Sequence, residues 1–358
     1  MSEPYVPPPY PYDRLDGVKA IAAQHPSGGI DLSIGAPSDP PPPAVIAAMS
    51  SSDAERGYPA SLGSKVFRQA AATWLSDLVG IDLPAQQLNA TVGSKELVAG
   101  LPHWLHLRRP DLDTVLYPAV SYPSYAMGAR LGNCRAVPVP VDQDWRLRLD
   151  AIDPADAERA LCLWINSPGN PTGAIEDLEA AASWGRANGV PVFSDECYIE
   201  FCWERDPASI LQHGLDGVVA VHSLSKRSNL AGARTGFYAG DADLVHYLGE
   251  VRKHSGFMVP GPMQNAAVAA FTDTAHVGVQ RDIYRQRMES MIGVLNDRIG
   301  IDVPMPEGGF YLWAKAPGGD AWAFAETLAR ELGIITSPGE FYGDASPDYV
   351  RIAMVRAA

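Results

Sequence analysis

The chain has 358 residues, of which 46% are hydrophobic and 20% are charged. This balance is typical of a folded protein with a large core and excludes a disordered chain. Its 28 basic and 42 acidic residues give a formal net charge of −14, which disfavours nucleic acid and anionic membrane surfaces as partners. An anionic ligand would therefore be bound by local cations and backbone N–H groups.

The cellular compartment is indicated by weak signals only. No stretch reaches the length of a membrane span, and the first residues lack the basic and apolar regions of a secretory signal. The four cysteines form no CxxC pair, and two of them lie in apolar runs, which is typical of free, buried thiols. We therefore expect a cytoplasmic protein. The cysteines are Cys134, Cys162, Cys197 and Cys202.

The first 45 residues are proline-rich and irregular, and end in the proline run 40–43. A polyproline ligand for a partner protein is one interpretation of this run. The absence of a second proline motif favours a stiff arm over residues 1–45 that leads into a helix from Ala44. A further helix is predicted over 65–79, with Gly80 as its stop signal.

From about residue 89 to 240, short apolar runs alternate with helical stretches. This alternation predicts a mostly parallel sheet that is covered by helices on both faces. Ligands of such sheets bind beyond the carboxyl ends of the strands. The expected strands are 114–117, 136–141, 161–165, 190–194, 218–222 and 236–239, and the expected helices are 95–107, 122–131, 176–188 and 208–212.

After residue 243 the pattern changes and predicts a second, smaller α+β domain. Its expected elements are helices at 243–252, 263–299 and 322–332 and strands at 309–314 and 350–355. We therefore expect a large domain over 46–242 and a small domain over 243–358, with the arm 1–45 as part of the small domain. No internal repeat is visible.

Two polar residues follow expected strands at the edge where a ligand would bind. Asn170 lies in the loop 168–173, which two prolines and two glycines make rigid, although Asn-Pro is also an ordinary turn former. Asp195 follows the strand 190–194, where an unpaired carboxylate is costly. Taken alone, Asp195 is equally well explained as a helix N-cap.

Two cations follow the strand 218–222. Desolvation of Lys226 would lower the pKa of its amine and allow it to attack a carbonyl carbon. Arg234 is suited to a bidentate contact with an anion. Taken alone, each is more simply a surface residue. Upstream, Gly93, Ser94 and Lys95 open a helix whose N–H groups form a ready anion site, and a plain N-cap at Ser94 is compatible with this.

The order of these groups is more informative than any one of them. Tyr122 adds an aromatic ring after a strand, Tyr198 follows Asp195, and Ser223 precedes Lys226 by three residues. Together they predict a pocket for a phosphorylated pyridine aldehyde. Such a ligand needs a phosphate cradle, a stacking ring, a charged partner for its ring nitrogen and an amine for its aldehyde.

On these motifs the chain resembles the fold type I, pyridoxal-phosphate-dependent aminotransferases of the class I/II group, from about residue 34 to 351. The resemblance implies an α/β fold with a large domain built on a mostly parallel mixed sheet, plus a smaller α+β domain. It implies pyridoxal 5′-phosphate as cofactor and amino acids and keto acids as substrates. Lys226 would join the cofactor and move protons, Asp195 would keep the pyridine nitrogen protonated, and Tyr198 is the third implied catalytic residue.

The resemblance also implies the remaining site residues. Arg351 would bind the substrate α-carboxylate, together with Gly35 and Asn170, and an ordinary strand-edge arginine is the less favoured alternative. Tyr58 would reach the phosphate in a neighbouring subunit, which implies a homodimer. The implied cofactor-binding residues are Gly93, Ser94, Lys95, Tyr122, Asn170, Asp195, Tyr198, Ser223, Lys226, Arg234 and Tyr58.

Substrate choice is less specific. The segments 223–232 and 254–262 are similar to N-succinyldiaminopimelate aminotransferases of the short actinobacterial type. This implies amino transfer between glutamate and N-succinyl-2-amino-6-oxopimelate in lysine and diaminopimelate biosynthesis. Arg227 and Arg252 are candidates for binding the distal carboxylates of that substrate.

Several alternatives stay open. An aminotransferase of another amino acid (aromatic, alanine or aspartate) is the nearest, and a carbon–sulfur β-lyase on the same fold is a second. A cofactor-sensing transcription regulator would need a basic helix-turn-helix, for which residues 1–45 leave no room. His103 and His106 lie on one helix without a neighbouring carboxylate, so no metal site is predicted.

Overall fold

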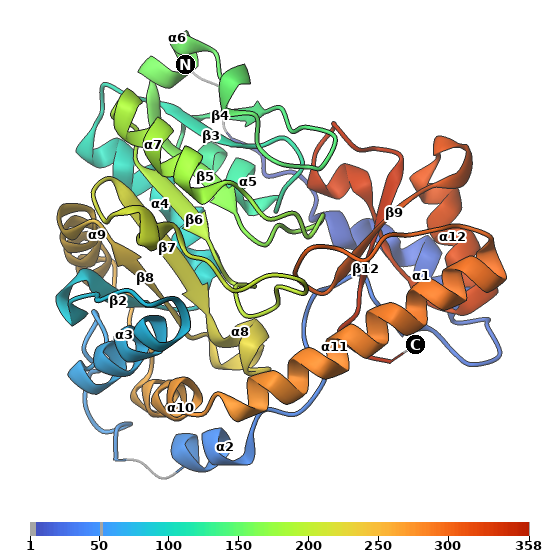
Figure 1. Cartoon of the computed structure of the whole chain (residues 1–358), viewed down its shortest axis with the longest axis horizontal. Coiled ribbons are helices and arrows are strands. Elements are labelled where there is room, and N and C mark those ends of the chain that lie inside the picture. The colour runs from blue at the N-terminus through green and yellow to red at the C-terminus, as the bar shows by residue number, and fades with distance from the viewer. Residues whose placement is uncertain (1–4, 51–52, 358) are drawn as a thin grey trace.

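A seven-stranded sheet forms the centre of the larger part of the molecule (Figure 1), in a computed structural model that describes residues 5–50 and 53–357. The strand order is β2-β8-β7-β6-β5-β3-β4. The strand β8 runs antiparallel to both of its neighbours, and the other pairs are parallel. The strands are β2 (Leu88–Thr91), β3 (Thr114–Pro118), β4 (Arg135–Val139), β5 (Ala160–Asn166), β6 (Val192–Asp195), β7 (Val218–Ser223) and β8 (Gly236–Gly240).

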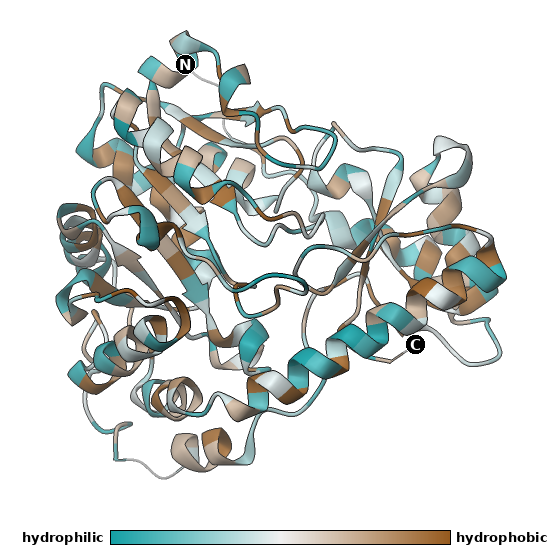
Figure 2. Cartoon of the chain, in the orientation of Figure 1, coloured by the Kyte–Doolittle hydropathy of each residue, from teal (hydrophilic) through white to brown (hydrophobic). Residues whose placement is uncertain are grey.

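Helices cover both faces of this sheet because its central strands are apolar on both sides. Every residue of β5, β6, β7 and β8 is buried. Figure 2 shows the same strands as a hydrophobic centre, while α11 presents a mixed, largely hydrophilic surface. One face packs against α3 (Lys65–Val79), α7 (Leu178–Asn188) and α10 (Gly261–Thr272), and the other against α4 (Ser94–Arg108), α5 (Ser124–Leu131) and α9 (Ala242–His254).

The second unit is smaller and mixes short strands with helices. An antiparallel sheet has the order β11-β12-β9, and β1 pairs in parallel with β10. One hydrophobic cluster joins them to the three helices of this unit. The elements are β1 (Ile30–Asp31), β9 (Tyr311–Lys315), β10 (Ile334–Ile335), β11 (Ser337–Pro338), β12 (Tyr349–Ala353), α1 (Asp16–Ala22), α11 (Ala275–Val294) and α12 (Ala321–Leu332).

The predicted mostly parallel sheet and its flanking helices are confirmed, with strand bounds that differ by one or two residues. The helix over 65–79 is also confirmed. Ser64 caps its first turn by accepting a hydrogen bond from the Phe67 N–H, and Gly80 ends it with φ of 71°. Three further α-helices are short: α2 (Pro43–Ser50), α6 (Pro154–Glu158) and α8 (Leu224–Arg227).

Two predicted helices are wrong in detail. The single helix expected over 263–299 is divided at Asp273, whose extended backbone (φ −104°, ψ 106°) ends α10 before α11 begins. The segment expected as a helix over 208–212 is a 3₁₀ turn over Ile210–His213, which Ser209 caps through its hydroxyl.

The packing of α9 and α10 suggests a different division of the chain. Leu248 of α9 lies in the core beneath one face of the large sheet, and Phe271 of α10 lies in the core beneath the other. In the arm, Leu15 and Leu32 lie in the core of the smaller unit. We therefore propose a domain boundary between α10 and α11, in place of residue 243, with the arm in the smaller domain.

Replacing Phe271 by Ala tests this division. The ring packs edge-on against Phe67 and Phe237 at centroid distances of 6.0 and 5.6 Å. We expect Phe271→Ala to lower the free energy of unfolding in urea by about 3–5 kcal/mol, since it leaves a cavity in the large core. The control Val279→Ala, on an exposed side chain of α11, should change it by less than about 0.5 kcal/mol. A small effect at Phe271 would contradict the division.

Candidate active site

A cavity of about 1380 Å³ lies at the carboxyl ends of β5, β6 and β7, between the two units. Apart from the two candidates for the distal carboxylates, all but two of the site residues predicted from the sequence line this cavity. The exceptions are Gly93, which adjoins the guanidinium of Arg234, and Tyr58, which is 98% exposed. The residues brought together are Gly35, Ser94, Lys95, Tyr122, Asn170, Asp195, Tyr198, Ser223, Lys226, Arg234 and Arg351.

Lys226 enters the cavity from α8, one turn after β7 ends. Its Nζ donates a hydrogen bond to the Gly35 carbonyl oxygen and lies 5.9 Å from the centroid of the Phe310 ring. Burial lowers the pKa of Lys226 to about 8, and the charges of Arg351 and Arg234 act in the same direction. Near neutral pH a far larger fraction of this amine is therefore neutral, and hence nucleophilic and basic, than of an ordinary lysine.

Asp195 is the last residue of β6, and its carboxylate is buried. Its Oδ2 accepts a hydrogen bond from the Tyr125 hydroxyl at 2.9 Å, and its Oδ1 accepts one from the Cys197 N–H at 3.3 Å. No helix starts here, so the N-cap interpretation is wrong. Burial raises the pKa of Asp195, so its negative charge needs a cationic partner in the cavity.

The start of α4 forms an anion cradle. Gly93 occupies the N-cap position with φ of 68°, and no side chain caps this helix. A Cβ at Gly93 would lie 2.2 Å from Nη2 of Arg234, so only glycine lets the guanidinium reach the helix N-terminus. The hydroxyls of Ser223 and Ser225 lie on the same cavity. Open N–H groups, hydroxyls and an arginine together suit a phosphate group.

Arg351 forms a second anion site on the side of the smaller unit. It lies on β12, the central strand of its sheet, and is 2% exposed, so the strand-edge interpretation is wrong. Nη1 donates to Asn170 Oδ1 at 2.7 Å, and the guanidinium lies over the Tyr311 ring at 4.2 Å. Its buried Nε has no hydrogen-bond partner among the described residues. Such a site suits a substrate carboxylate.

Gly35 and Tyr198 both lie against Tyr311, a residue to which the sequence analysis assigned no role. The hydroxyl of Tyr198 lies 2.8 Å from that of Tyr311, and a Cβ at Gly35 would lie 2.0 Å from the Tyr311 hydroxyl. Glycine is therefore required where the arm crosses the cavity. Sequence reasoning likewise missed Tyr125 and Ser225, although both lie within motifs that it identified.

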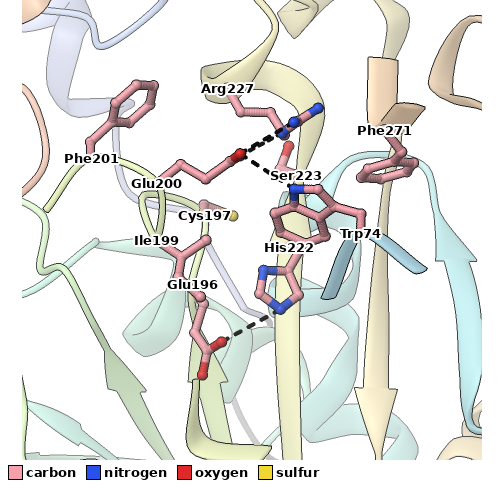
Figure 3. A pocket seen from close by; sticks show the side chains of 10 residues that line it. All are labelled: Trp74, Glu196, Cys197, Ile199, Glu200, Phe201, His222, Ser223, Arg227 and Phe271. Atoms are coloured by element: carbon pink, nitrogen blue, oxygen red, sulfur yellow. Dashed lines mark hydrogen bonds and ion pairs between the residues drawn. The ribbon is translucent and has the colours of Figure 1, made fainter. Parts of the chain in front are cut away.

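A layer of buried polar groups lies around a small pocket that shares Cys197 and Ser223 with the cavity (Figure 3). Glu200 pairs with Arg227 through two contacts, of 2.5 and 3.2 Å, and accepts a hydrogen bond from the Trp74 Nε1–H at 3.3 Å. Nearby, Glu196 lies 3.5 Å from His222, whose pKa burial lowers to about 3. This layer joins the chain after β6 to the chain after β7.

The candidates for binding distal carboxylates are therefore wrong. Arg227 is engaged by Glu200 and by the Ala270 carbonyl oxygen at 2.6 Å. Arg252 is 1% exposed, pairs with Glu96 and donates to the Ala90 carbonyl oxygen at 2.8 Å. Neither lines the cavity.

The donor set matches the pyridoxal phosphate that the sequence analysis expected. The cradle at Gly93 suits a phosphate, the buried carboxylate of Asp195 suits a protonated ring nitrogen, and Lys226 supplies an amine of lowered pKa. Tyr122 lies on the cavity wall, where it contacts Tyr125 edge-on at 5.8 Å.

Comparison with known proteins agrees with this geometry. The family model described as "Aminotransferase class I and II" matches residues 27–358. The chain belongs to the class I and II aminotransferases. It is a pyridoxal-phosphate-dependent aminotransferase, as expected from its motifs.

Two curated relatives and one solved structure illustrate the range of this family. A 4-dedimethylamino-4-oxo-anhydrotetracycline transaminase of Streptomyces rimosus is 40% identical, over 97% of this chain and 94% of that protein. An LL-diaminopimelate aminotransferase of Oleidesulfovibrio alaskensis is 33% identical, over 97% and 92%. The structure of a probable N-succinyldiaminopimelate aminotransferase of Thermus thermophilus has a TM-score of 0.87 at 31% identity and covers 97% of this chain and 96% of that one.

The lowered pKa of Lys226 can be measured directly. In the protein freed of cofactor, we expect reductive methylation of Lys226 by formaldehyde to rise with pH and reach half its maximum at about pH 8, because only the neutral amine reacts. Peptide mass spectrometry gives the extent at each pH. The exposed Lys315 serves as the internal comparison. Parallel curves for the two lysines would contradict the desolvation of Lys226.

Removal of only one partner of the Glu200–Arg227 pair should lower the free energy of unfolding. Their side chains are 8% and 4% exposed, so Arg227→Met leaves a buried carboxylate without its cation. We expect a loss of about 3–5 kcal/mol in the free energy of unfolding. The double variant Glu200→Leu/Arg227→Met should recover much of this loss in urea denaturation. Equal losses in the single and double variants would contradict this account.

Proposed function

We propose that this enzyme transfers the amino group of glutamate to N-succinyl-2-amino-6-oxopimelate, as an N-succinyldiaminopimelate aminotransferase of lysine and diaminopimelate biosynthesis. One observation carries the proposal: the cavity of about 1380 Å³ extends far beyond the catalytic lysine and Arg351. It therefore leaves room for a substrate longer than a simple amino acid. Relatives with diaminopimelate and succinyldiaminopimelate in their names support the same choice.

Each residue has a distinct part in the proposed reaction. Bound pyridoxal phosphate supplies an electron sink that stabilises negative charge on the substrate α-carbon. Arg351 and Asn170 hold the substrate α-carboxylate and so fix the α-carbon. Lys226, with its lowered pKa, removes the α-proton and later returns it, a role worth about 10²–10⁴-fold in rate.

The other residues hold the cofactor in the proposed site. Asp195 provides the negative charge that keeps the ring nitrogen protonated, and Tyr125 orients its carboxylate. Tyr198 provides a hydroxyl for the ring oxygen, and Tyr122 an aromatic ring for stacking. The phosphate would be held by Gly93, Ser94, Lys95, Ser223 and Arg234.

The proposed active form is a homodimer. Tyr58 is 98% exposed in the single chain, on a segment apart from the cavity. An exposed tyrosine of this kind is free to complete the phosphate site of a second copy. The free, buried state of all four cysteines supports a reducing compartment, and we propose the cytoplasm. No helix of the described residues is both long and apolar enough to cross a membrane.

Replacing Lys226 by Ala tests the catalytic assignment. We expect Lys226→Ala to reduce the rate of transamination by at least about 10²-fold while the protein stays folded by circular dichroism. Borohydride reduction of the wild-type holoenzyme should place the cofactor label on the peptide that contains Lys226. A label on another lysine, or full activity of the variant, would contradict the assignment.

A substrate panel tests the proposed reaction. With glutamate as donor, N-succinyl-2-amino-6-oxopimelate should give a higher kcat/KM than phenylpyruvate, pyruvate or oxaloacetate. Pyruvate release from cystathionine would indicate the β-lyase instead. If another keto acid gives the highest kcat/KM, the proposed substrate is wrong although the enzyme remains an aminotransferase.

Mixed dimers test the shared site. Lys226→Ala chains and Tyr58→Ala chains should each show weak activity, whereas a mixture refolded together should regain activity. A hybrid dimer contains one site with both residues intact. Activity of the mixture equal to the mean of its two components would contradict a site that is shared between copies.

A further inference from the structure

The cavity has a long extension that the catalytic residues do not use. One face of α5 forms its floor, since Ser124, Met127 and Arg130 line it at helical spacing. The segment 5–12 also lines the cavity, and its Tyr5 hydroxyl donates a hydrogen bond of 3.3 Å to Met127 Sδ on α5. We call this space the α5 groove.

The catalytic end of the α5 groove is fixed by Tyr125, which donates its hydrogen bond to Asp195. Ser124 directly precedes Tyr125 on this helix. Arg130 lies six residues after Ser124, which corresponds to about 9 Å along the helix axis. The proposed substrate has nine bonds between its reacting carbon and its succinyl carboxylate. Fully extended, these span about 10 Å, as three residues of extended chain do. The extended substrate is therefore about as long as the distance along the helix from Ser124 to Arg130.

Arg130 is the cation that remains at this far end. Of the six basic side chains on the cavity, Lys226, Arg234 and Arg351 serve the catalytic end. Arg14 pairs with Glu340 at 2.7 Å, and Lys95 lies 5.4 Å from the Tyr10 ring. Within the part of the chain that the structure describes, Arg130 forms neither an ion pair nor a side-chain hydrogen bond.

A negative charge, that of Asp344, lies in the same region as Arg130. Burial raises the pKa of Tyr117, Arg130 lowers it, and Asp344 raises it, so both charged groups lie near the Tyr117 hydroxyl. Asp344 lies on the same cavity and should repel an anion there. Removing the charge of Arg130 should therefore weaken the binding of an anionic substrate, and removing the charge of Asp344 should strengthen it.

We propose that Arg130 binds the succinyl carboxylate of the substrate at the far end of the α5 groove. The inference rests on the proposed succinylated substrate. Glutamate is too short to reach Arg130 from the catalytic end. Arg130 is thus a specificity residue, and it acts on the keto-acid half of the reaction alone.

Steady-state kinetics of Arg130→Gln test this inference. We expect KM for N-succinyl-2-amino-6-oxopimelate to rise about two- to fivefold, the upper range of a partly exposed charged contact, with kcat and the KM for glutamate unchanged. Arg130→Lys should recover part of the affinity. Asp344→Asn should lower the same KM, which a merely structural role for Arg130 does not predict. The control Arg135→Gln removes a positive charge outside the cavity and should change neither KM.

The outcomes separate the inference from the proposed function. If the wild-type enzyme does not use the succinylated keto acid, the proposed function is wrong, and this inference with it. If the wild type uses it and Arg130→Gln changes its KM less than twofold, only the inference is wrong. An equal rise in the KM for glutamate, or for the keto acid without its succinyl group, would also overturn the assignment.

Discussion

The burial of the charged groups that follow β6 and β7 is the constraint on which the rest of the structure depends. Burial makes the Lys226 amine a base near neutral pH, and the same burial raises the pKa of Asp195. These shifts are unfavourable for an empty, charged site and favourable for one that accepts a cationic ring and a carbonyl group. The fold thus prepares both groups before any ligand arrives.

Lys226 and Asp195 need a rigid support that keeps them in fixed positions relative to each other. The Glu200–Arg227 pair provides it, because Arg227 follows Lys226 directly and Glu200 lies two residues after Tyr198 (Figure 3). A buried ion pair adds little stability over an apolar pair of the same size, but it defines a single geometry. We interpret the pair as a device that fixes the relative positions of the two strand ends.

Sequence patterns identify the residues that follow strands, because strand position alone brings Asn170, Asp195 and Lys226 to one edge. They do not reveal contacts between distant elements. Tyr311 reaches Tyr198 from the smaller unit, and Tyr125 reaches Asp195 from the neighbouring helix. The division of the helix expected over 263–299 was also missed, since Asp273 adopts an extended backbone without a glycine or proline to signal it.

Burial and pairing, rather than sequence position, decide what each arginine does in this acidic chain. Arg227 and Arg252 have their guanidinium groups engaged inside the protein, so neither has charge to offer a ligand. Arg351 is buried but keeps one N–H without a partner among the described groups, as a carboxylate site requires. Arg130 is exposed, lines the cavity and lacks an ion pair within the described chain. Its charge is therefore free to meet the distal carboxylate of the long, anionic substrate that we propose.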